Sequence, residues 1–337
     1  MFYAGLFLFV FVVSWFLTKV LLRYALSKNL LDIPNRRSSH LLPTPRGGGM
    51  AIVVTFYIGL LLMAGFVQLE PSILVGLIGA GVVVASVGFI DDHRHIAARW
   101  RLLVHFVAAG WLLFWLGGLP PALAEFSFVW GNLLVVLYLV WLLNLYNFMD
   151  GIDGIASIET MTVCLGGVVL YLLNDASGVA WVEPALLFSA VTGFFFWNFP
   201  RAKIFMGDVG SGFLGLMLGA FSLKAAWIDP QLFWGWLILM GSFVVDATVT
   251  LVRRVLRGEP FYEAHRSHAY QYISRKYQSH SLVSLSFGAV NLFWLLPIAV
   301  FVTVNWIDGV AGVTIAYIPL LFLALWYKSG KKEDINR

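Results

Sequence analysis

Long runs of apolar residues, separated by short polar clusters, occupy most of the chain. Each run approaches the roughly 20 residues that a helix needs to cross a bilayer, and none shows the ten-residue alternation of a barrel strand. In the first run the basic residues follow the apolar stretch, so we expect a retained helix and not a secretory signal. The pattern predicts an all-α polytopic membrane protein of about eleven transmembrane helices, near residues 2–22, 49–67, 72–90, 101–118, 130–147, 155–173, 181–199, 209–227, 231–252, 282–303 and 309–327.

Basic residues gather in alternate connectors. Of the 22 Lys and Arg residues, all but Lys224 follow spans one, three, seven, nine and eleven or adjoin their ends. The opposite connectors instead carry Glu70, Glu125, Asp175, Glu183, Asp229 and Asp308. Because cytoplasmic loops are enriched in Lys and Arg, we expect the N-terminus outside and the C-terminus in the cytoplasm.

Composition narrows the class of protein further. Only 12% of the residues are charged, against roughly 25% in a soluble domain, which excludes a water-soluble fold. The formal charge of +4 resides mainly in the connectors, so a nucleic-acid-binding protein is disfavoured. The single cysteine, Cys164, excludes a disulfide within the chain and a Cys-rich metal site. We find no repeat or domain boundary, so residues 1–337 are expected to form one integral membrane domain.

Two blocks of acids and amides lie at ends of spans on the expected cytoplasmic side. Asp91 and Asp92 end span three, where two adjacent carboxylates repel each other unless a cation or proton intervenes; a solvated helix end is the alternative. After span five, Asn144, Asn147 and Asp150 are spaced three apart and share one helix face. They continue into a Gly-x-Asp-Gly turn at residues 151–154, in which glycine permits close approach of a ligand. An unoccupied loop is the less favoured interpretation of this second block.

A third block, residues 198–212, opens span eight with Phe-Met-Gly-Asp-Val-Gly-Ser-Gly and carries Arg201 and Lys203. The N-terminus of such a helix can face a phosphate. Asp91, Asp92, Asp150, Asp153 and Asp208 together offer oxygen ligands suited to Mg²⁺ or Mn²⁺. Carboxylates that bind a metal, beside bases that bind phosphate, favour phosphoryl transfer.

Two more polar connectors accompany these blocks. Residues 32–49 contain Arg36, Arg37 and the rigid segment Pro-Thr-Pro-Arg46-Gly-Gly-Gly. A basic membrane anchor would explain the arginines but not the rigid proline and glycine residues. Residues 254–281 contain His265-Arg266-Ser267-His268, where contacts to phosphate or sugar are favoured over a zinc site because no third ligand lies nearby. Asp246 in span nine is interpreted equally well as a substrate or proton group and as a polar residue paired within the bundle.

Taken together, these blocks resemble the polyprenyl-phosphate N-acetylhexosamine-1-phosphate transferase family (WecA/MraY-like), most closely O-antigen-initiating members such as WbpL. The resemblance spans nearly the whole chain. Its specific part is the joint occurrence of the Asp-Asp pair, the Asn-x-x-Asn-x-x-Asp-Gly-x-Asp-Gly block and Phe-Met-Gly-Asp-x-Gly-Ser at helix ends.

The resemblance implies transfer of an N-acetylhexosamine-1-phosphate, of the GlcNAc, QuiNAc or FucNAc type, from a UDP-sugar to undecaprenyl phosphate with release of UMP. It implies Mg²⁺ as cofactor, for which Mn²⁺ can substitute, and an active site in cytoplasmic loops of the bacterial inner membrane. The product would initiate O-antigen, as part of lipopolysaccharide, or another cell-surface polysaccharide. No nucleic-acid partner is expected, and a homodimer stays open.

The resemblance also implies residue roles. Mg²⁺ would bind Asp208, with Asn147 as a further ligand, and Asp91 is the candidate for deprotonating the lipid phosphate, although whether it or Asp92 is the base stays open. Asp150 would shape the metal and phosphate cluster. The residues expected to contact substrates are Arg101 for phosphate, Asp153, Asn198 and Phe205 for uridine, with Gly151, Asn144, Arg46, His265, Arg266 and His268.

Three alternatives remain. The His265 to His268 segment differs from the denser histidine runs of MraY, so a phospho-MurNAc-pentapeptide transferase is disfavoured. An ion-coupled secondary transporter typically has polar groups near the membrane midplane and two halves of related sequence, whereas these acids gather at one face of the membrane. A structural scaffold gives no reason for five acids on one side.

Overall fold

The computed structural model of the chain describes residues 1–34, 39–40, 42–67, 69–94, 96–121, 128–259 and 265–331. Arg36 and Arg37 of the polar connector, Glu125, Lys332 and Arg337 lie outside the described residues. The first helices are α1 (Phe2–Ser27), α2 (Gly49–Ala64), α3 (Pro71–His93), α4 (Ala98–Trp115), α5 (Phe128–Met149), α6 (Ile155–Leu172) and α7 (Val182–Asn198). They are followed by α8 (Asp208–Ile228), α9 (Pro230–Leu239), α10 (Gly241–Leu256), α11 (Ala269–Tyr277), α12 (His280–Val290), α13 (Leu296–Thr303) and α14 (Gly309–Trp326).

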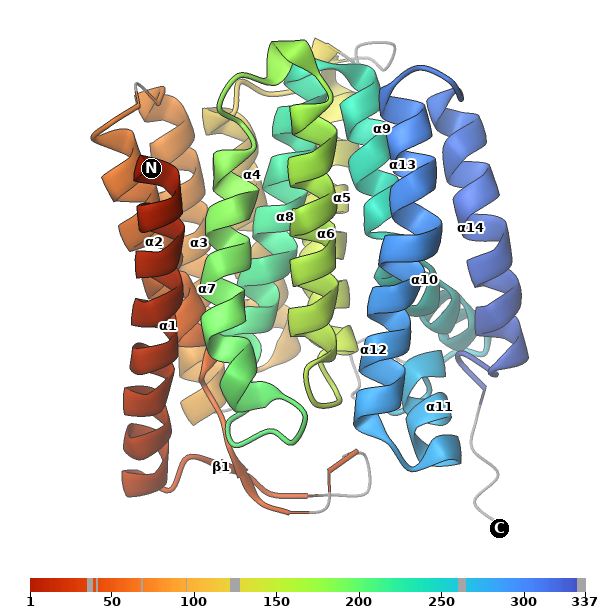
Figure 1. Cartoon of the computed structure of the whole chain (residues 1–337). Coiled ribbons are helices and arrows are strands. Elements are labelled where there is room, and N and C mark those ends of the chain that lie inside the picture. The colour runs from red at the N-terminus through yellow and green to blue at the C-terminus, as the bar shows by residue number, and fades with distance from the viewer. Residues whose placement is uncertain are drawn as a thin grey trace.

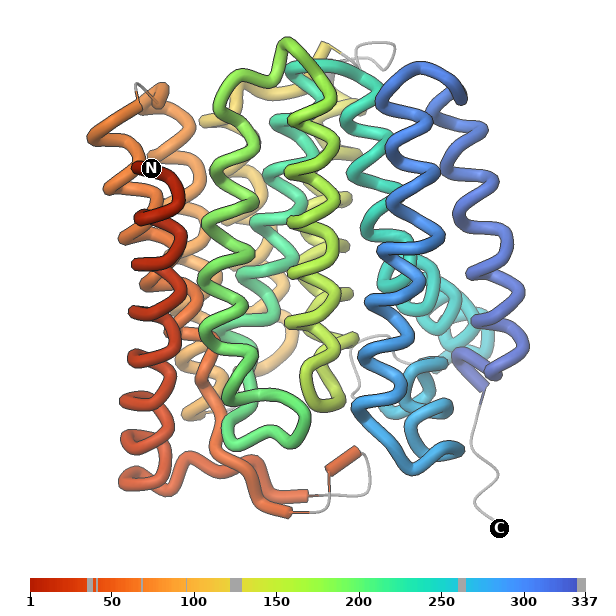
Figure 2. The backbone as a smooth tube through the Cα atoms, viewed as in Figure 1, coloured from red at the N-terminus to blue at the C-terminus, as the bar shows by residue number. Residues whose placement is uncertain are grey.

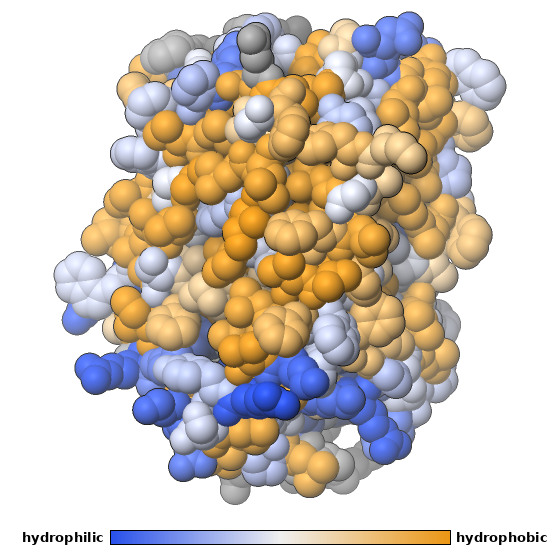
Figure 3. Space-filling model, turned by 60° about the vertical axis from the view of Figure 1, so that its left-hand side comes forward, coloured by the Kyte–Doolittle hydropathy of each residue, from blue (hydrophilic) through white to orange (hydrophobic). Residues whose placement is uncertain are grey.

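The long helices stand side by side, and α1 begins near the opposite end of the bundle from that at which α14 ends (Figure 1). Among the described residues, seven helices are long and apolar enough to cross a membrane, or eight if the bent pair α9 and α10 is one span. Hydrophobic side chains cover most of the middle of the face in Figure 3, above a band of hydrophilic ones. The chain is therefore a multi-pass membrane protein. The count of eleven crossings and the orientation of the termini stay predictions.

The expected ninth span is not one straight helix. It consists of α9 and α10, which are bent by 67° at Met240. The apolar pattern continues through the bend, which explains why hydropathy alone predicts a single span. As a result α10 leaves the bundle direction and lies across its lower part (Figure 1).

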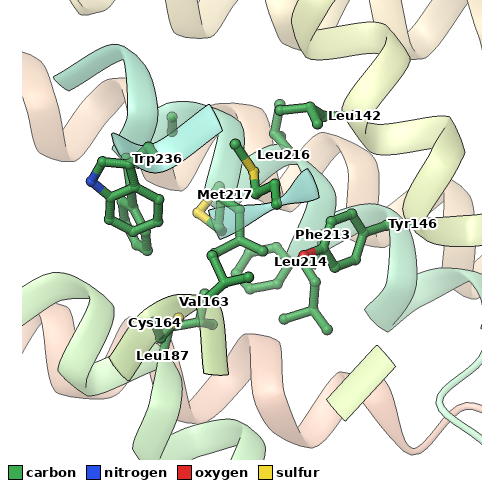
Figure 4. Close-up of a cluster of buried hydrophobic side chains, with 14 of the residues drawn as sticks. Leu142, Tyr146, Val163, Cys164, Leu187, Phe213, Leu214, Leu216, Met217 and Trp236 are labelled. Atoms are coloured by element: carbon green, nitrogen blue, oxygen red, sulfur yellow. The ribbon is translucent and has the colours of Figure 1, made fainter. Parts of the chain in front are cut away.

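Helix α8 is the centre of the core. Its side chains Phe213, Leu214, Leu216 and Met217 lie among residues of α5, α6, α7 and α9, as Figure 4 shows. Close approach to α5 depends on Gly215, because a Cβ atom there would lie 2.5 Å from the backbone oxygen of Leu142. This packing holds the first turn of α8, with Asp208, against α3 and α5.

A small hairpin lies below the bundle. Strands β1 (Leu31–Asp32) and β2 (Thr44–Pro45) are antiparallel, with Leu31 opposite Pro45. Figure 2 shows this segment running beneath the lower helix ends. It is tied to the segment before α8, because the N–H of Phe205 donates to the backbone oxygen of Pro45 at 2.7 Å. The hairpin thereby lies beside the connectors that carry the predicted site.

Candidate active site

A cavity of about 190 Å³ lies where these connectors meet, and it collects residues that are far apart in the sequence. Four of the predicted acids line it, from three separate blocks: Asp92, Asp150, Asp153 and Asp208. Asp32 of β1 adds a fifth carboxylate, and Arg46 adds a positive charge. The folded chain therefore brings together the acids that the sequence places at separate helix ends.

Asp92 holds the first turn of α8. Its carboxylate accepts hydrogen bonds from the backbone N–H groups of Asp208, at 3.1 Å, and Val209, at 3.4 Å. These N–H groups have no partner within their own helix, and the positive end of the helix dipole favours a carboxylate there. Gly207 permits the arrangement, because its φ of 76° and ψ of 171° are accessible essentially only to glycine. Asp92 thus fixes where the Asp208 side chain begins.

Arg101 links two of the predicted catalytic acids. Its Nη1 atom lies 2.7 Å from Oδ2 of Asp91 and 2.7 Å from Oδ2 of Asp208. The other oxygen of Asp91 accepts the N–H of Ile96 at 2.6 Å. The Asp91 side chain is buried, whereas that of Arg101 is 26% exposed. Asp91 therefore serves in this structure to anchor Arg101, and one guanidinium nitrogen bridges α3 and α8.

Asn147 and Asp150 enter the same cavity from α5 and the turn after it. The side-chain amide of Asn147 donates to the Ser211 hydroxyl at 3.1 Å and also hydrogen-bonds the carboxylate of Asp208. Burial, reinforced by the nearby carboxylates of Asp208, Asp92 and Asp153, raises the pKa of Asp150 to about 7. The larger cause is removal of the carboxyl from water, and repulsion between like charges adds to it; a bound cation would relieve that repulsion.

The donor chemistry of this cavity fits Mg²⁺, which prefers carboxylate and amide oxygens. Within the described part of the chain, however, no three His, Cys, Asp or Glu side chains stand in an arrangement that could hold a metal ion. Arg101 occupies one oxygen of Asp208. The carboxylate and amide oxygens thus lie in one cavity, but they are not arranged as a complete coordination shell for a metal ion.

Asp153 pairs with a histidine that sequence analysis missed. Nδ1 of His280 lies 3.2 Å from Oδ2 of Asp153, and its Nε2 lies 3.2 Å from the backbone oxygen of Ser39. His280 begins α12 and lines the cavity with Ser39. No local motif marks this histidine, because its partners are 127 and 241 positions away. One side chain thus joins the hairpin region, the Asp153 turn and α12.

Asn198 and Phe205 also line the cavity, but their contacts differ in kind. Asn198 is buried, and its side chain accepts the N–H of Gly154 at 2.9 Å and donates to the oxygen of Ile204 at 3.1 Å. It positions two cavity loops relative to each other. The Phe205 ring instead lies 4.9 Å from the ring of His40, edge to face, so these two rings form an aromatic part of the wall.

Gly151 packs against α11 in the wall of the cavity. A Cβ atom on it would lie 2.2 Å from the hydroxyl of Tyr270, which donates to the backbone oxygen of Phe148 at 3.0 Å. Gln271, the next residue of α11, lines the cavity and was not among the predicted site residues. Its carbonyl accepts the N–H of His268, so its orientation is fixed by the start of the helix.

The start of α11 is held by Asp246, for which the structure favours the second of the two interpretations. The carboxylate accepts the N–H groups of Ala269, at 2.9 Å, and Tyr270, at 3.1 Å, and the Ser329 hydroxyl at 2.8 Å. Asp246 is buried on α10 and does not line the carboxylate cavity. It is a paired residue of the bundle that caps α11.

The histidine segment lies beside the cavity without lining it. His268 is buried, with its Nδ1 atom 3.8 Å from Asp246, and His265 bonds to the Ser267 hydroxyl at 3.1 Å. The backbone oxygen of Arg266 accepts from Arg275. In this structure His265, Arg266 and His268 therefore hold the start of α11 and the segment before it, and their contact with substrate stays a prediction.

Asn144 does not face the carboxylate cavity but lies in an adjoining groove of about 780 Å³. Leu102, Trp141 and Leu251 contribute to its apolar walls, which come from α4, α5 and α10. Arg99 and Arg101 supply charge near one end of α4. Because Arg101 also binds Asp91 and Asp208, the groove and the cavity meet at this residue.

Comparison with known proteins identifies the family of the chain. The model for glycosyl transferase family 4 matches residues 74–226. The decaprenyl-phosphate N-acetylglucosaminephosphotransferase of Mycobacterium leprae is 30% identical over 85% of this chain and 82% of its own. The chain belongs to glycosyl transferase family 4.

Two further relatives of this family 4 chain differ in how much of it they match. The probable undecaprenyl-phosphate N-acetylglucosaminyl 1-phosphate transferase of Bacillus subtilis is 26% identical over 88% of each chain. A phospho-N-acetylmuramoyl-pentapeptide-transferase of Synechococcus is 32% identical, but over only 60% of each chain. The family match includes the Asp91, Asp150 and Asp208 blocks and ends before α10 and α11. The family match thus covers the three acidic blocks that line or adjoin the carboxylate cavity.

Proposed function

We propose that the chain transfers an N-acetylhexosamine-1-phosphate from a UDP-sugar to undecaprenyl phosphate and releases UMP. The names of the M. leprae and B. subtilis relatives support transfer to a polyprenyl phosphate. The observation that carries the proposal is the position of Arg101, between a cavity of carboxylates and an apolar groove. Such a junction suits a reaction between a polar donor and a lipid acceptor.

The acceptor is proposed to lie in the groove between α4, α5 and α10. Its apolar walls, including Leu137, Trp141 and Leu251, suit a hydrocarbon chain, and Arg101 suits the phosphate at the end of that chain. The amide of Asn144 donates to the Val140 oxygen at 2.7 Å, and the same side chain also hydrogen-bonds His105, so its orientation in the groove wall is fixed. The lipid would therefore approach from the side of the bundle while its phosphate reaches the acids.

In the proposed step an oxygen of the lipid phosphate attacks the β-phosphorus of the UDP-sugar. A new phosphorus–oxygen bond forms to the lipid, the bond between the β-phosphorus and the bridging oxygen breaks, and that oxygen leaves with UMP. The second pKa of a phosphate monoester is about 6, so the attacking group is largely dianionic at neutral pH. Asp91 then contributes mainly by holding Arg101, and its role as a base becomes secondary.

Mg²⁺, or Mn²⁺ in its place, is proposed at Asp208 with Asn147, where it would neutralise phosphate charge during transfer. Asp92 and Asp150 complete the acidic wall of the cavity, and Asp92 fixes the backbone of Asp208. Arg46 lines the same cavity and offers a positive charge to the donor phosphates. These side chains would orient the reactants in the cavity.

The donor is proposed to place its uracil between Phe205 and the Asp153 turn, with Gly151 allowing close approach. An N-acetylated hexosamine of the GlcNAc, QuiNAc or FucNAc type is the proposed sugar. We infer that the cavity faces the cytoplasm of a bacterial inner membrane, where nucleotide sugars are available. Its product would begin a lipid-linked O-antigen of lipopolysaccharide or another cell-surface polysaccharide.

The test is release of UMP by the purified protein. Reactions contain undecaprenyl phosphate, Mg²⁺ and a panel of UDP-HexNAc donors that includes UDP-MurNAc-pentapeptide. We expect UMP with at least one small UDP-HexNAc, and none with Asp208→Ala, whose fold is checked by thermal unfolding. Turnover that survives both EDTA and Asp208→Ala would refute the metal site. No UMP with any donor would refute the transferase and favour transport.

A further inference from the structure

Lys224, the one basic residue expected on the side opposite to the cytoplasm, lies at the wall of a second large cavity. This cavity, of about 780 Å³, is framed by the start of α3, the end of α4, the start of α7 and the end of α8. All four helix ends lie at the end of the bundle opposite to the carboxylate cavity (Figure 1). It is therefore separate from the proposed reaction site.

Lys224 forms an ion pair with Glu183 in the wall of this cavity. Its ammonium donates to both carboxylate oxygens of Glu183, and the side chains are only 12% and 3% exposed. Taking two charges out of water costs more than their attraction usually returns, so a pair of apolar residues would be at least as stable. Ionisable groups within a membrane bundle therefore indicate a function.

The other walls of the cavity supply an acid and aromatic rings. Glu70 lies at its rim, before the first residue of α3, and is exposed. Trp115 and Trp227 come from the last turns of α4 and α8, at the depth where indole rings meet lipid headgroups. Glu70 and the faces of these rings attract an ammonium group.

The charge arrangement has two parts. Glu183 takes two of the three N–H donors of the Lys224 ammonium, so the third can donate to a phosphate oxygen in the cavity. Glu70 and the indoles form the complementary part for a cation. A ligand that carries a phosphate and an ammonium on one short linker matches both parts.

We propose that this cavity binds the headgroup of a zwitterionic phospholipid, with its phosphate at Lys224 and its ammonium at Glu70 and the indoles. The four helix ends place the cavity at headgroup depth, so such a lipid would enter directly from its leaflet. The site does not depend on the proposed transfer reaction.

The test compares lipids that remain bound after purification. Full-length protein is reconstituted in vesicles of equal phosphatidylethanolamine and phosphatidylglycerol, extracted in mild detergent and analysed by native mass spectrometry. We expect preferential retention of phosphatidylethanolamine. Glu70→Gln should reduce the ratio of the two lipids roughly threefold, the change expected for loss of one exposed charge contact.

Two further variants make the test specific. Asp175→Asn changes an exposed acid at the same end of the bundle that does not line the cavity, and it should leave the lipid ratio unchanged. The double variant Glu183→Leu/Lys224→Met removes both buried charges together, which avoids an unpaired charge and should abolish the preference. Equal retention of both lipids by the unmodified protein, or an equal effect of Asp175→Asn, would overturn the proposal.

Discussion

Nη1 of Arg101 lies 2.7 Å from Oδ2 of Asp208, although 107 positions separate the two residues in the chain. The same nitrogen binds Asp91, so the guanidinium neutralises two acids while it borders the apolar groove. A phosphate that entered the groove would compete for this cation. Arg101 is therefore the residue through which acceptor binding and the acidic cavity influence each other.

Replacing Arg101 by Ala should lower kcat/KM by about 100-fold or more, because one preorganised donor to developing charge is lost. Arg101→Lys should recover only part of the activity, since an ammonium cannot reproduce the planar geometry of the guanidinium. The measurement is UMP release at varied undecaprenyl phosphate concentration. Arg99→Ala is the control, because Arg99 lines the groove but is exposed, and its effect should stay within roughly threefold. Equal losses in the two variants would contradict the assignment.

Gly207→Ala should abolish UMP release while lowering the free energy of unfolding only moderately. The backbone there has φ of 76°, and an added Cβ atom would lie 2.4 Å from Oδ2 of Asp92, which caps α8. Strained backbone costs about 1–3 kcal/mol in unfolding free energy, and the clash additionally displaces Asp92.

Gly178→Ala is the matched control for this variant. Gly178 also has positive φ, of 53°, but nothing lies within 4 Å of its Cβ position. Both variants should lower the melting temperature, and only Gly207→Ala should lose UMP release. Activity of Gly207→Ala close to that of Gly178→Ala would show that the position of Asp92 is not critical.

Most of the architecture follows from the sequence, because a bilayer requires long apolar helices and their ends are marked by polar residues. The acids of three blocks gather in one cavity for the same reason, since alternate helix ends share one end of the bundle. The bend at Met240 could not be predicted, because hydropathy does not report direction. His280 was missed because its partners lie on distant segments, and Gln271 because only the folded chain brings the start of α11 to the cavity.

Residue type alone also leaves a side chain's role open. Asn198 was expected to contact uridine, yet both ends of its amide bind backbone groups of the cavity loops. Asp246 shows the same ambiguity, because a carboxylate within a span can serve a substrate or cap a helix. Only the folded contacts, made between separate helices, distinguish these roles.

Mg²⁺ affinity should rise between pH 6 and pH 8. The pKa of Asp150 is raised to about 7 by burial and by Asp208, Asp92 and Asp153, so this carboxyl is mostly protonated at pH 6 and mostly ionised at pH 8. A proton and a cation compete for the same acidic wall, and binding of the cation releases the proton. Isothermal titration calorimetry in buffers of different ionisation enthalpy measures both quantities. Asp150→Asn should flatten the dependence, and an unchanged slope would exclude Asp150 as its source.

Asp246→Ala should destabilise the protein and also impair donor binding. It removes the acceptor of two buried N–H groups at the start of α11, each worth about 1–3 kcal/mol when left unsatisfied. The first turn of α11 carries Tyr270, against Gly151, and Gln271, in the cavity wall, so its loosening should raise KM for the UDP-sugar. Asp308→Ala removes the acceptor of two exposed N–H groups at the start of α14, far from the cavity, and should lower the melting temperature by less without changing KM. If the two variants share the same KM, α11 does not shape the donor site.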